Sequence, residues 1–406
     1  MSTNAALEEF YRDLHANPEL SLQETRTAGV VAERMRALGL DVTEGVGGTG
    51  VVAVLENGAG KVVWLRADMD GLPVEEKTGL DYASTVTTIA ADGTEVPVMH
   101  ACGHDMHVTW LVGAVERLVE TKADWAGTVV AVFQPAEETL EGARAMVADD
   151  IAGRFPRPDV VIGQHVGPLP AGVVSLTSGA AMAGVDDLAI VLHGKGGHGS
   201  RPETTVDPVL AAASTVVSLQ QVVSREVTPG QLAVVTVGSL HAGTKSNIIP
   251  DEARLALNIR TVDATTRDRV IEAVHRIVRG QAQAAGMTEP PTITEVVSAP
   301  ATVNSAEHVD ILRARFTHEW GAPAVIDYGT VSGSEDVGIL ASAAGAPLVF
   351  WITGGADPAT FAAAAASGRM EQEIPSNHSP YYAPVLQPTI ERGVDALVIG
   401  ATTFLA

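Results

Sequence analysis

The stretch Thr128-Val-Val-Ala-Val-Phe-Gln-Pro-Ala-Glu-Glu138 joins a continuous apolar run to a turn that carries two adjacent carboxylates. An unbroken apolar run of this length is typical of a strand that is buried on both faces of a sheet. A helical pattern follows Asp105, its predicted N-cap. Further strands are predicted at Val51–Leu55, Val62–Leu65, Asp159–Gly163 and Pro347–Ile352, the first two adjacent and joined through a turn at Asn57 and Gly58. Because strands alternate with helices, the sequence predicts an α/β fold.

A second pattern interrupts the first from about residue 186. Its predicted elements are Leu188–His193, Asp207–Ser224, Leu232–Leu240, Arg254–Val262, Thr265–Ala285 and Thr292–Val297, in the order β-α-β-β-α-β. This is the order of a ferredoxin-like α+β fold. We therefore expect an inserted domain at 186–298, within a larger domain formed by 1–185 and 299–406.

The composition limits the partners that this chain can have. Its 406 residues include 26 Lys and Arg against 49 Asp and Glu, a net charge of −23. Such an acidic surface repels phosphate backbones and anionic lipids, so neither nucleic acid nor a membrane is an expected partner. The single cysteine excludes an internal disulfide, and the N-terminal residues lack the pattern of a signal peptide. These features favour a cytoplasmic protein that acts on a small molecule.

Three glycines match a dinucleotide-binding spacing but lie in the wrong context. Gly45, Gly47 and Gly50 fit G-x-G-x-x-G, a motif that requires a helix directly after the glycines. A predicted strand follows them here. The glycines therefore indicate a turn that enters a strand, and no nicotinamide cofactor is expected.

The segment His100-Ala-Cys-Gly-His-Asp-Met-His107 gathers the only thiol and three histidines just before the predicted helix. Cys102 and His104 are two residues apart, so a thiolate and an imidazole could share one metal ion. A buried cysteine beside structural histidines is the alternative interpretation. Mixed cysteine, histidine and glutamate ligation suits zinc and also accommodates manganese, cobalt or nickel.

Further candidate ligands follow other strands of the predicted sheet. Asp68 and Asp70 follow the strand that ends at Leu65, Glu137 and Glu138 follow the central apolar run, and His165 follows the strand that ends at Gly163. Open α/β sheets bind ligands beyond the carboxyl ends of their strands. We therefore expect these groups, together with His378, to meet in one pocket.

The paired carboxylates at 137 and 138 indicate hydrolytic chemistry. One of the two can ligate a metal ion, and the other can act as a general base that takes a proton from water. A solvated surface pair is the alternative interpretation of two adjacent glutamates.

Seven motifs taken together resemble the N-acyl-amino-acid amidohydrolases, a family that includes hippurate hydrolases, bacterial aminoacylases and indole-acetyl-amino-acid hydrolases. The motifs occur in order along nearly the whole chain: Leu65-Arg-Ala-Asp-Met-Asp-Gly-Leu-Pro73, His100 to His107, Phe133-Gln-Pro-Ala-Glu-Glu138, Gly196-Gly-His-Gly-Ser-Arg-Pro202, Asn247-Ile-Ile-Pro250, Ser332-Gly-Ser-Glu-Asp336 and Asn377-His-Ser-Pro380. The resemblance implies a zinc-peptidase-like catalytic domain with a mixed sheet flanked by helices. It also implies that the inserted domain is a lid or dimerisation domain and that the protein is a homodimer.

The resemblance also implies roles for individual residues. The implied metal ligands, enough for two divalent ions, are Cys102, His104, Glu138, His165 and His378. Glu137 would be the general base and acid, and Asp70 and Asp105 would orient the ligands. His198, often supplied to the partner subunit's site in this family, would hold the oxyanion of the tetrahedral intermediate. Arg260 and Asn247 would grip the α-carboxylate of the substrate.

The implied reaction is hydrolysis of an N-acyl-L-amino acid to a carboxylic acid and a free amino acid. A dipeptidase or carboxypeptidase with the same centre is an alternative, as is a metal-binding relative that has lost catalysis. The sequence departs from the family at Gln164, where leucine is commoner before the histidine. We expect that departure to affect the shape of the pocket.

Overall fold

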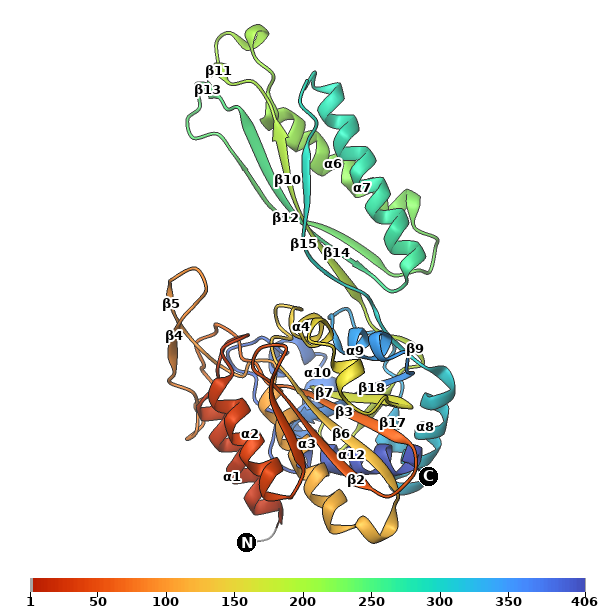
Figure 1. Cartoon of the computed structure of the whole chain (residues 1–406). Coiled ribbons are helices and arrows are strands. Elements are labelled where there is room, and N and C mark those ends of the chain that lie inside the picture. The colour runs from red at the N-terminus through yellow and green to blue at the C-terminus, as the bar shows by residue number, and fades with distance from the viewer. Residues whose placement is uncertain (1–2, 406) are drawn as a thin grey trace. The chain divides into compact units, whose positions relative to one another are not determined.

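The computed structural model describes residues 3–405, which form two compact units (Figure 1). Unit 1 comprises Met1–Ala181, Val303–Gly329 and Asp336–Ala406, and unit 2 comprises Met182–Thr302 and Thr330–Glu335. Unit 2 thus interrupts unit 1 in the sequence.

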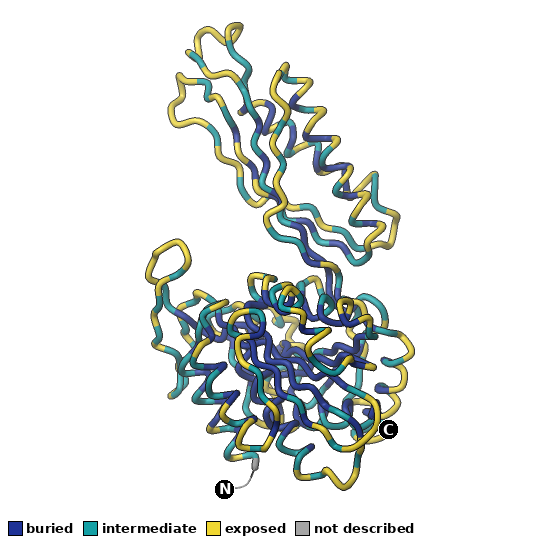
Figure 2. The backbone as a smooth tube through the Cα atoms, in the orientation of Figure 1, coloured by how far each residue is buried: buried dark blue, intermediate teal, exposed yellow. Residues whose placement is uncertain are grey.

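Unit 1 is built on an eight-stranded mixed sheet with the order β1-β2-β6-β3-β7-β18-β8-β17. The bounds of these strands are β1 (Asp41–Val46), β2 (Gly50–Asn57), β3 (Val62–Asp68), β6 (Gly127–Gln134), β7 (Val160–Pro170), β8 (Val174–Leu176), β17 (Val325–Ile326) and β18 (Leu348–Ala356). Strands β6, β3, β7 and β18 run parallel to one another. They form the buried centre of the sheet, as the dark blue segments of unit 1 in Figure 2 show.

The prediction that the strands at Val51–Leu55 and Val62–Leu65 are neighbours is wrong. Strand β6 lies between β2 and β3, pairing antiparallel with β2 and parallel with β3. In its central position β3 has a neighbouring strand on each side and buries its apolar side chains on both faces of the sheet. A simple hairpin with β2 would give β3 only one neighbouring strand. The glycines at 47 and 48 lie in the turn between β1 and β2, so the prediction of a turn there is confirmed.

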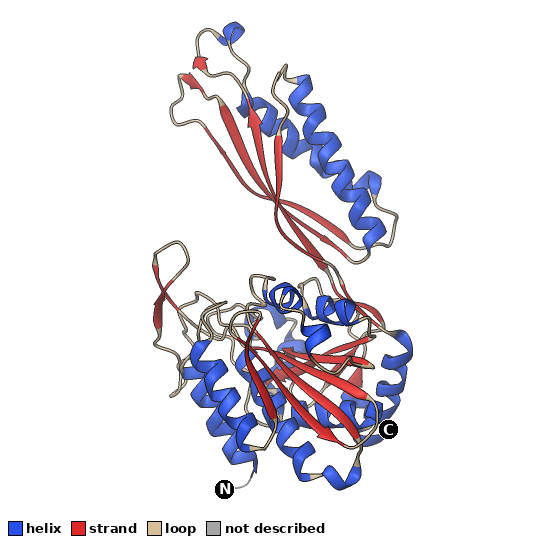
Figure 3. Ribbon diagram, in the orientation of Figure 1, coloured by secondary structure: helices blue, strands red, loops and turns tan. Residues whose placement is uncertain are grey.

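Helices cover both faces of this sheet (Figure 3). Their bounds are α1 (Thr3–Ala16), α2 (Thr25–Ala37), α3 (His104–Glu120), α4 (Gly142–Ala148), α5 (Ile151–Arg154), α8 (Ala306–Trp320), α9 (Val337–Ala344), α10 (Pro358–Ser367), α11 (Met370–Glu373) and α12 (Thr389–Leu405). Helices α3 and α12 pack on β3 and β7, and α9 packs on β7. Shorter strands are β4 (Thr87–Ile89), β5 (Glu95–Pro97), β9 (Gly179–Met182) and β16 (Thr302–Asn304).

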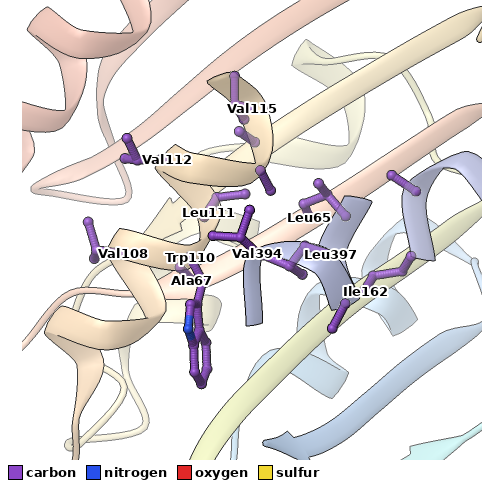
Figure 4. Packing of buried hydrophobic residues seen from close by; sticks show 14 of the residues in the cluster. Leu65, Ala67, Val108, Trp110, Leu111, Val112, Val115, Ile162, Val394 and Leu397 are labelled. Carbon is purple, nitrogen blue, oxygen red and sulfur yellow. The ribbon is translucent and has the colours of Figure 1, made fainter. Parts of the chain in front are cut away.

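The contact between α3 and α12 forms the centre of the hydrophobic core (Figure 4). Trp110 of α3 is fully buried, and its indole N–H donates to the carbonyl of Thr389 at 2.9 Å. Leu111 and Val394 lie in the same cluster, together with Leu65 of β3. This packing holds the helix that begins at His104 firmly on the sheet.

Unit 2 has the predicted ferredoxin-like plan. Its strands and helices are β10 (Gly184–His193), β11 (Gly197–His198), α6 (Pro208–Glu226), β12 (Ala233–Ala242), β13 (Ile248–Ile249), β14 (Glu252–Thr261), α7 (Ala264–Ala284) and β15 (Thr292–Ala299). The four long strands form an antiparallel sheet with the order β12-β14-β10-β15, and α6 packs against α7. The α/β fold with an inserted ferredoxin-like domain is therefore confirmed. The role of unit 2 as a lid or dimerisation domain stays a prediction.

None of the helices within residues 3–405 is both long enough and apolar enough to cross a bilayer.

Two glycines of α12 offer a matched test of the core. We expect Gly393→Ala to destabilise the protein by about 1–3 kcal/mol, because the new methyl carbon would lie 2.1 Å from Cε2 of Trp110. Gly400→Ala on the same helix is the control, since its nearest atom outside the helix would be Cδ1 of Ile162 at 3.4 Å. Alanine's helix propensity favours both variants by up to ~1 kcal/mol. Urea unfolding followed by circular dichroism measures both, and equal midpoints would contradict the packing described here.

Candidate active site

The register of the parallel strands brings the predicted site residues to one level of the sheet. Asp68 on β3 pairs with Gln134 on β6, and Arg66 pairs with Gly163 on β7. His165 therefore lies at the level at which β3 and β6 end. It does not follow its strand, as the sequence suggested, because β7 continues to Pro170.

A tight turn presents Cys102 and His104 together. Gly103 lies between them with φ +85° and directly precedes helix α3. A Cβ atom at Gly103 would lie 2.4 Å from Cγ1 of Val166, so only glycine fits between the turn and β7. The helix thus begins one residue before Asp105, and the prediction that Asp105 is the N-cap is wrong.

The side chain of His104 is oriented by Asp70. Its Nδ1 lies 3.2 Å from Oδ1 of Asp70, so Nε2 is the ring nitrogen left to bind a metal ion. Burial raises the pKa of Asp70, but the hydrogen bonds from His104 and Ser21 outweigh burial and lower it below its usual value. Asp70 is therefore an ionised acceptor at neutral pH.

His165 is fixed in the same way through a backbone group. Its Nδ1 donates to the carbonyl of Val166 at 2.7 Å, and its Nε2 lies 3.4 Å from Sγ of Cys102. Burial and the neighbouring His107 lower the pKa of His165 well below its usual value. The imidazole is therefore neutral, which is the form that binds metal ions.

The two carboxylates lie on the turn after β6. The backbone N–H groups of Glu137 and Glu138 donate to the two oxygens of Asp70, at 3.1 and 3.0 Å. Oε2 of Glu137 and Oε1 of Glu138 each lie 3.8 Å from Nε2 of His104. Asp70 thus positions one imidazole and both carboxylates.

His378 reaches the site from a distant loop in a strained conformation. Its φ is +70°, a value that residues other than glycine adopt mainly where the surrounding structure enforces it. Its Nε2 lies 3.4 Å from Oε2 of Glu138. The amide of Asn377 donates to the carbonyls of Cys102 and Val166, at 3.0 and 3.1 Å, and so fastens the loop to both segments.

These donors fit a metal centre. Nε2 of His104 and Oε1 of Glu138 are buried and have no hydrogen-bond partner among residues 3–405, an arrangement that is costly unless another group satisfies them. Ligand atoms of Cys102, His104 and His165 lie within 4.8 Å of one another, as do those of Cys102, Glu138 and His378. The five predicted ligands therefore form two groups that share Cys102, and soft sulfur, imidazole and carboxylate donors suit a transition metal.

No role was predicted for His107 from the sequence, and the structure shows that it supports the site. Its Nδ1 lies 2.5 Å from Oδ1 of Asp68, and its Nε2 accepts the backbone N–H of Val166 at 2.8 Å. Both ring nitrogens are thus occupied, and the ring joins α3 to β3 and β7. Arg66, buried in an otherwise apolar strand, donates to Asp68 at 2.6 Å. A charged residue in such a run was the signal that could have revealed this network.

Asp105, predicted to orient a ligand, contacts a buried histidine of α1. Its Oδ2 lies 2.6 Å from Nδ1 of His15, and Oε1 of Glu76 lies 3.1 Å from the other ring nitrogen. The side chains of both acids are fully buried and His15 is 1% exposed. Burial lowers the pKa of His15, but these two carboxylates raise it to about 9.

In unit 2, the loop around His198 lies beside Asn247. His198 pairs with Ile248 in a two-residue ladder, and the N–H of Gly199 donates to the carbonyl of Asn247 at 2.9 Å. The backbone N–H of Ser200 donates to Nδ1 of His198 at 3.1 Å. Since Nδ1 is an acceptor, the ring proton lies on Nε2, where it can be donated to another molecule.

Arg260 is a half-buried cation held by neutral groups. Its Nε donates to Oδ1 of Asn258 at 2.9 Å, and its Nη1 donates to Oγ of Ser334 at 2.6 Å. Asn258 in turn donates to Asp187 at 2.6 Å. Among residues 3–405, no carboxylate lies within 4.0 Å of its guanidinium. Burial lowers the pKa of Arg260, and the attraction of Asp187 opposes that effect.

The sheet of unit 2 separates Arg260 from His198 and Asn247. Arg260 pairs with Val185 at one end of β10, whereas His198 follows β10 beyond His193 at the other end (Figure 1). The eight residue-to-residue steps from Val185 to His193 span about 27 Å of extended strand. The sequence implied that Asn247 and Arg260 grip one carboxylate, but within unit 2 the structure does not bring them together.

The expectation that Gln164 shapes the pocket is wrong. Strand alternation turns its side chain to the face opposite His165, where it donates to the carbonyl of Gly393 at 2.9 Å. Its oxygen accepts hydrogen bonds from Trp351 and Thr353, both at 2.9 Å. Gln164 therefore joins the sheet to α12.

Comparisons with known proteins show which family and which proteins the chain is similar to. Residues 64–373 match the model of peptidase family M20/M25/M40. The chain is 41% identical over 305 residues to hippurate hydrolase of Campylobacter jejuni, covering 75% of this chain and 76% of the relative. It is 39% identical over 330 residues to thermostable carboxypeptidase 2 of Saccharolobus solfataricus, covering 80% of each. The crystal structure of YxeP from Bacillus subtilis, described as a dinuclear metal-binding peptidase from family M20, matches with a TM-score of 0.79 and 27% identity over 100% of this chain and 99% of that one.

The buried pair of acids around His15 predicts a pH dependence of stability. The pKa of His15 is about 9 in the folded protein and 6.5 in the unfolded chain. The stabilisation by protonated His15 is therefore complete below pH 6.5 and is lost as pH rises through 9. At pH 6 we expect His15→Gln to lower the free energy of unfolding by about 3–5 kcal/mol, because Glu76 and Asp105 then lie buried without their cation.

Urea unfolding of the metal-free protein between pH 6 and 10 measures this effect. The difference in the free energy of unfolding between the wild-type protein and His15→Gln should narrow toward pH 10. The control is His318→Gln, a substitution of an exposed histidine. A gap that stays constant with pH would contradict the assigned pKa.

Proposed function

Because this chain belongs to peptidase family M20/M25/M40, we propose that it hydrolyses the amide bond of N-acyl-L-amino acids at the site described above. It is a metal-dependent hydrolase, and its relatives include hippurate hydrolase and carboxypeptidases. The observation that carries the proposal is the position of Glu137, a nearly buried carboxylate 3.8 Å from the unpartnered Nε2 of His104.

We propose that Cys102, His104, Glu138, His165 and His378 hold two divalent ions, with zinc favoured by the donor set. The ions, when bound, supply a Lewis acid for the scissile carbonyl and lower the pKa of water toward about 7. Asp70 and the carbonyl of Val166 keep two of the imidazoles in the tautomer that offers Nε2. The single cysteine is free and buried, which supports a reducing, cytoplasmic setting.

Glu137 is proposed as the group that moves protons. Its carboxylate takes a proton from the attacking water and returns it to the nitrogen of the leaving amino acid. Asp70 fixes the backbone of the turn, so the carboxylate of Glu137 keeps its position while it exchanges the proton.

His198 and Arg260 are proposed to bind the substrate. The Nε2 proton of His198 suits donation to an oxyanion, since Ser200 occupies the other ring nitrogen. Arg260 offers a planar guanidinium to the α-carboxylate, which overcomes the repulsion between an anionic substrate and a chain of net charge −23.

The length of unit 2 supports a homodimer. An N-acyl amino acid is much shorter than the distance of about 27 Å between the ends of β10, so His198 and Arg260 of one chain do not bind the same substrate molecule. We propose that His198 and Asn247 act on the substrate held by the partner subunit, through a dimer formed by the inserted domain.

A panel of substrates tests the proposed function. Metal-loaded protein should hydrolyse N-acetyl, N-benzoyl or long-chain N-acyl amino acids, and removal of metal by a chelator should abolish turnover. Turnover of free dipeptides in preference to all of these would favour the alternative, a dipeptidase or carboxypeptidase with the same centre. Absence of turnover on the whole panel would contradict the proposal.

The role of Glu137 predicts a loss of turnover without a loss of metal. We expect Glu137→Ala to lower kcat by about 10²–10⁴-fold, the usual contribution of a general base, while metal content by atomic emission stays that of the wild type. Glu141→Ala, an exposed glutamate of the same loop, is the control. Substantial activity in Glu137→Ala would show that another group is the base.

The dimer predicts complementation between two inactive variants. Glu137→Ala and His198→Ala, unfolded and refolded together, should form mixed dimers in which one of the two sites is complete. Random reassortment should restore about a quarter of wild-type activity. If His198 acts within its own chain, the mixture stays inactive.

A further inference from the structure

Glu24 is a buried carboxylate that the proposed mechanism does not use. Its side chain is fully buried, although it directly precedes helix α2, where acidic residues are usually exposed caps. It makes no cap bond to its own helix. Glu19 takes that role, accepting the backbone N–H groups of Arg26 and Thr27 at 2.9 and 2.8 Å.

The carboxylate of Glu24 points to the turn that carries the two catalytic-site glutamates. Oε1 accepts the backbone N–H of Ala136 at 2.8 Å, and Oε2 accepts the hydroxyl of Thr49 at 2.5 Å. Ala136 directly precedes Glu137. Glu24 also lies outside residues 64–373, the part of the chain that matches the family model.

Three successive backbone N–H groups of this turn therefore end on buried carboxylates. Ala136 donates to Glu24, and the next two residues, Glu137 and Glu138, donate to Asp70. Successive N–H groups of this kind form a concave site that favours an anion. In this chain the acceptors are the carboxyl groups of two of its own side chains.

The turn needs this support because its backbone is strained. Ala136 has φ +49° and Leu140 has φ +56°, values in the left-handed region that cost free energy in residues other than glycine. The carboxyl oxygen of Glu24 accepts the N–H of Ala136 at 2.8 Å, so Glu24 can hold the alanine in this conformation. Without it, the N–H of Ala136 would be buried without an acceptor, and the turn could relax.

We infer that Glu24 is a positioning residue for the reaction, whose carboxylate holds the turn at 136–138 so that Glu137 and Glu138 point into the site. The inference rests on the proposed function for its kinetic consequence, but the structural part is independent of it. Glu24 acts through the backbone of Ala136 and touches neither substrate nor metal.

Hydrogen–deuterium exchange of the metal-free protein tests the structural part. Glu24→Ala should speed exchange in peptides that cover 134–140 by about tenfold or more, with little change elsewhere. Glu24→Gln should retain protection, because its amide oxygen can still accept the N–H of Ala136. Glu19→Ala, the same substitution five residues earlier, should speed exchange at the start of α2 only.

Kinetics on the best substrate of the panel test the catalytic part. Glu24→Ala should lower kcat by about ten- to hundredfold, the effect of leaving a buried N–H group without its acceptor, with KM nearly unchanged. Glu24→Gln should stay within about threefold of the wild type, and Glu19→Ala should keep the wild-type kcat. If Glu24→Ala does not fold, Glu24→Asp, which shortens the reach by one methylene, should show the same faster exchange and lower kcat.

The outcomes separate the two proposals. Wild-type protein that turns over no substrate of the panel contradicts the proposed function, while the exchange data still decide the position of the turn. An active wild type with unchanged exchange and kcat in Glu24→Ala overturns the inference. Equal losses in Glu24→Ala and Glu24→Gln also overturn it, since the amide keeps the acceptor.

Discussion

A single buried guanidinium, that of Arg66, fixes the centre of unit 1. Arg66 is 2% exposed and lies on the middle strand β3. It donates to Asp68 at 2.6 Å, to Asp336 at 3.1 Å and, through Nε, to Gln134 at 2.9 Å. A buried cation without such partners would cost several kcal/mol. The folded state therefore requires β3, β6 and the start of α9 to meet at this point.

The order of the site follows from that requirement. Burial raises the pKa of Asp68, but Arg66 and the neighbouring His104 and His107 lower it well below its usual range, so Asp68 is ionised. Asp68 then holds His107, and His107 holds the backbone of β7 beside His165. Asp70, two residues further along, holds His104 and the turn of the two glutamates. The short segment from Asp68 to Asp70, at the end of β3, thus orients donors that come from three distant parts of the sequence.

Candidate ligands that lie in short motifs or at the ends of predicted strands could be predicted from the sequence, and the residues that support them through long-range contacts could not. The motif around Cys102 and the paired glutamates can be recognised by the spacing of their residues in the sequence. Three such residues are His15, Glu24 and Asn377. Each forms its hydrogen bond to a group at least 90 residues away in the chain, and for Glu24 the separation is 112 residues. No periodicity reports such contacts. The prediction of the strand order was wrong for a related reason. Pairing of β2 with β6 depends on which strands can be buried on both faces, and the turn residues at Gly58 do not report that.

On the proposed function, the length of the inserted domain means that substrate binding requires two chains to associate. Unit 1 supplies acidic and metal-binding groups, and it has no need of unit 2 for the orientation of its imidazoles, since Asp70 and Val166 belong to unit 1. Unit 2 supplies an oriented guanidinium at one end of its sheet and an imidazole with a free proton at the other. Because a small substrate cannot span a sheet of that length, a chain that uses both ends must use them on two substrates. On the proposed function, recognition of the carboxylate and stabilisation of the oxyanion come from different chains, so the proposed reaction depends on the association of two chains.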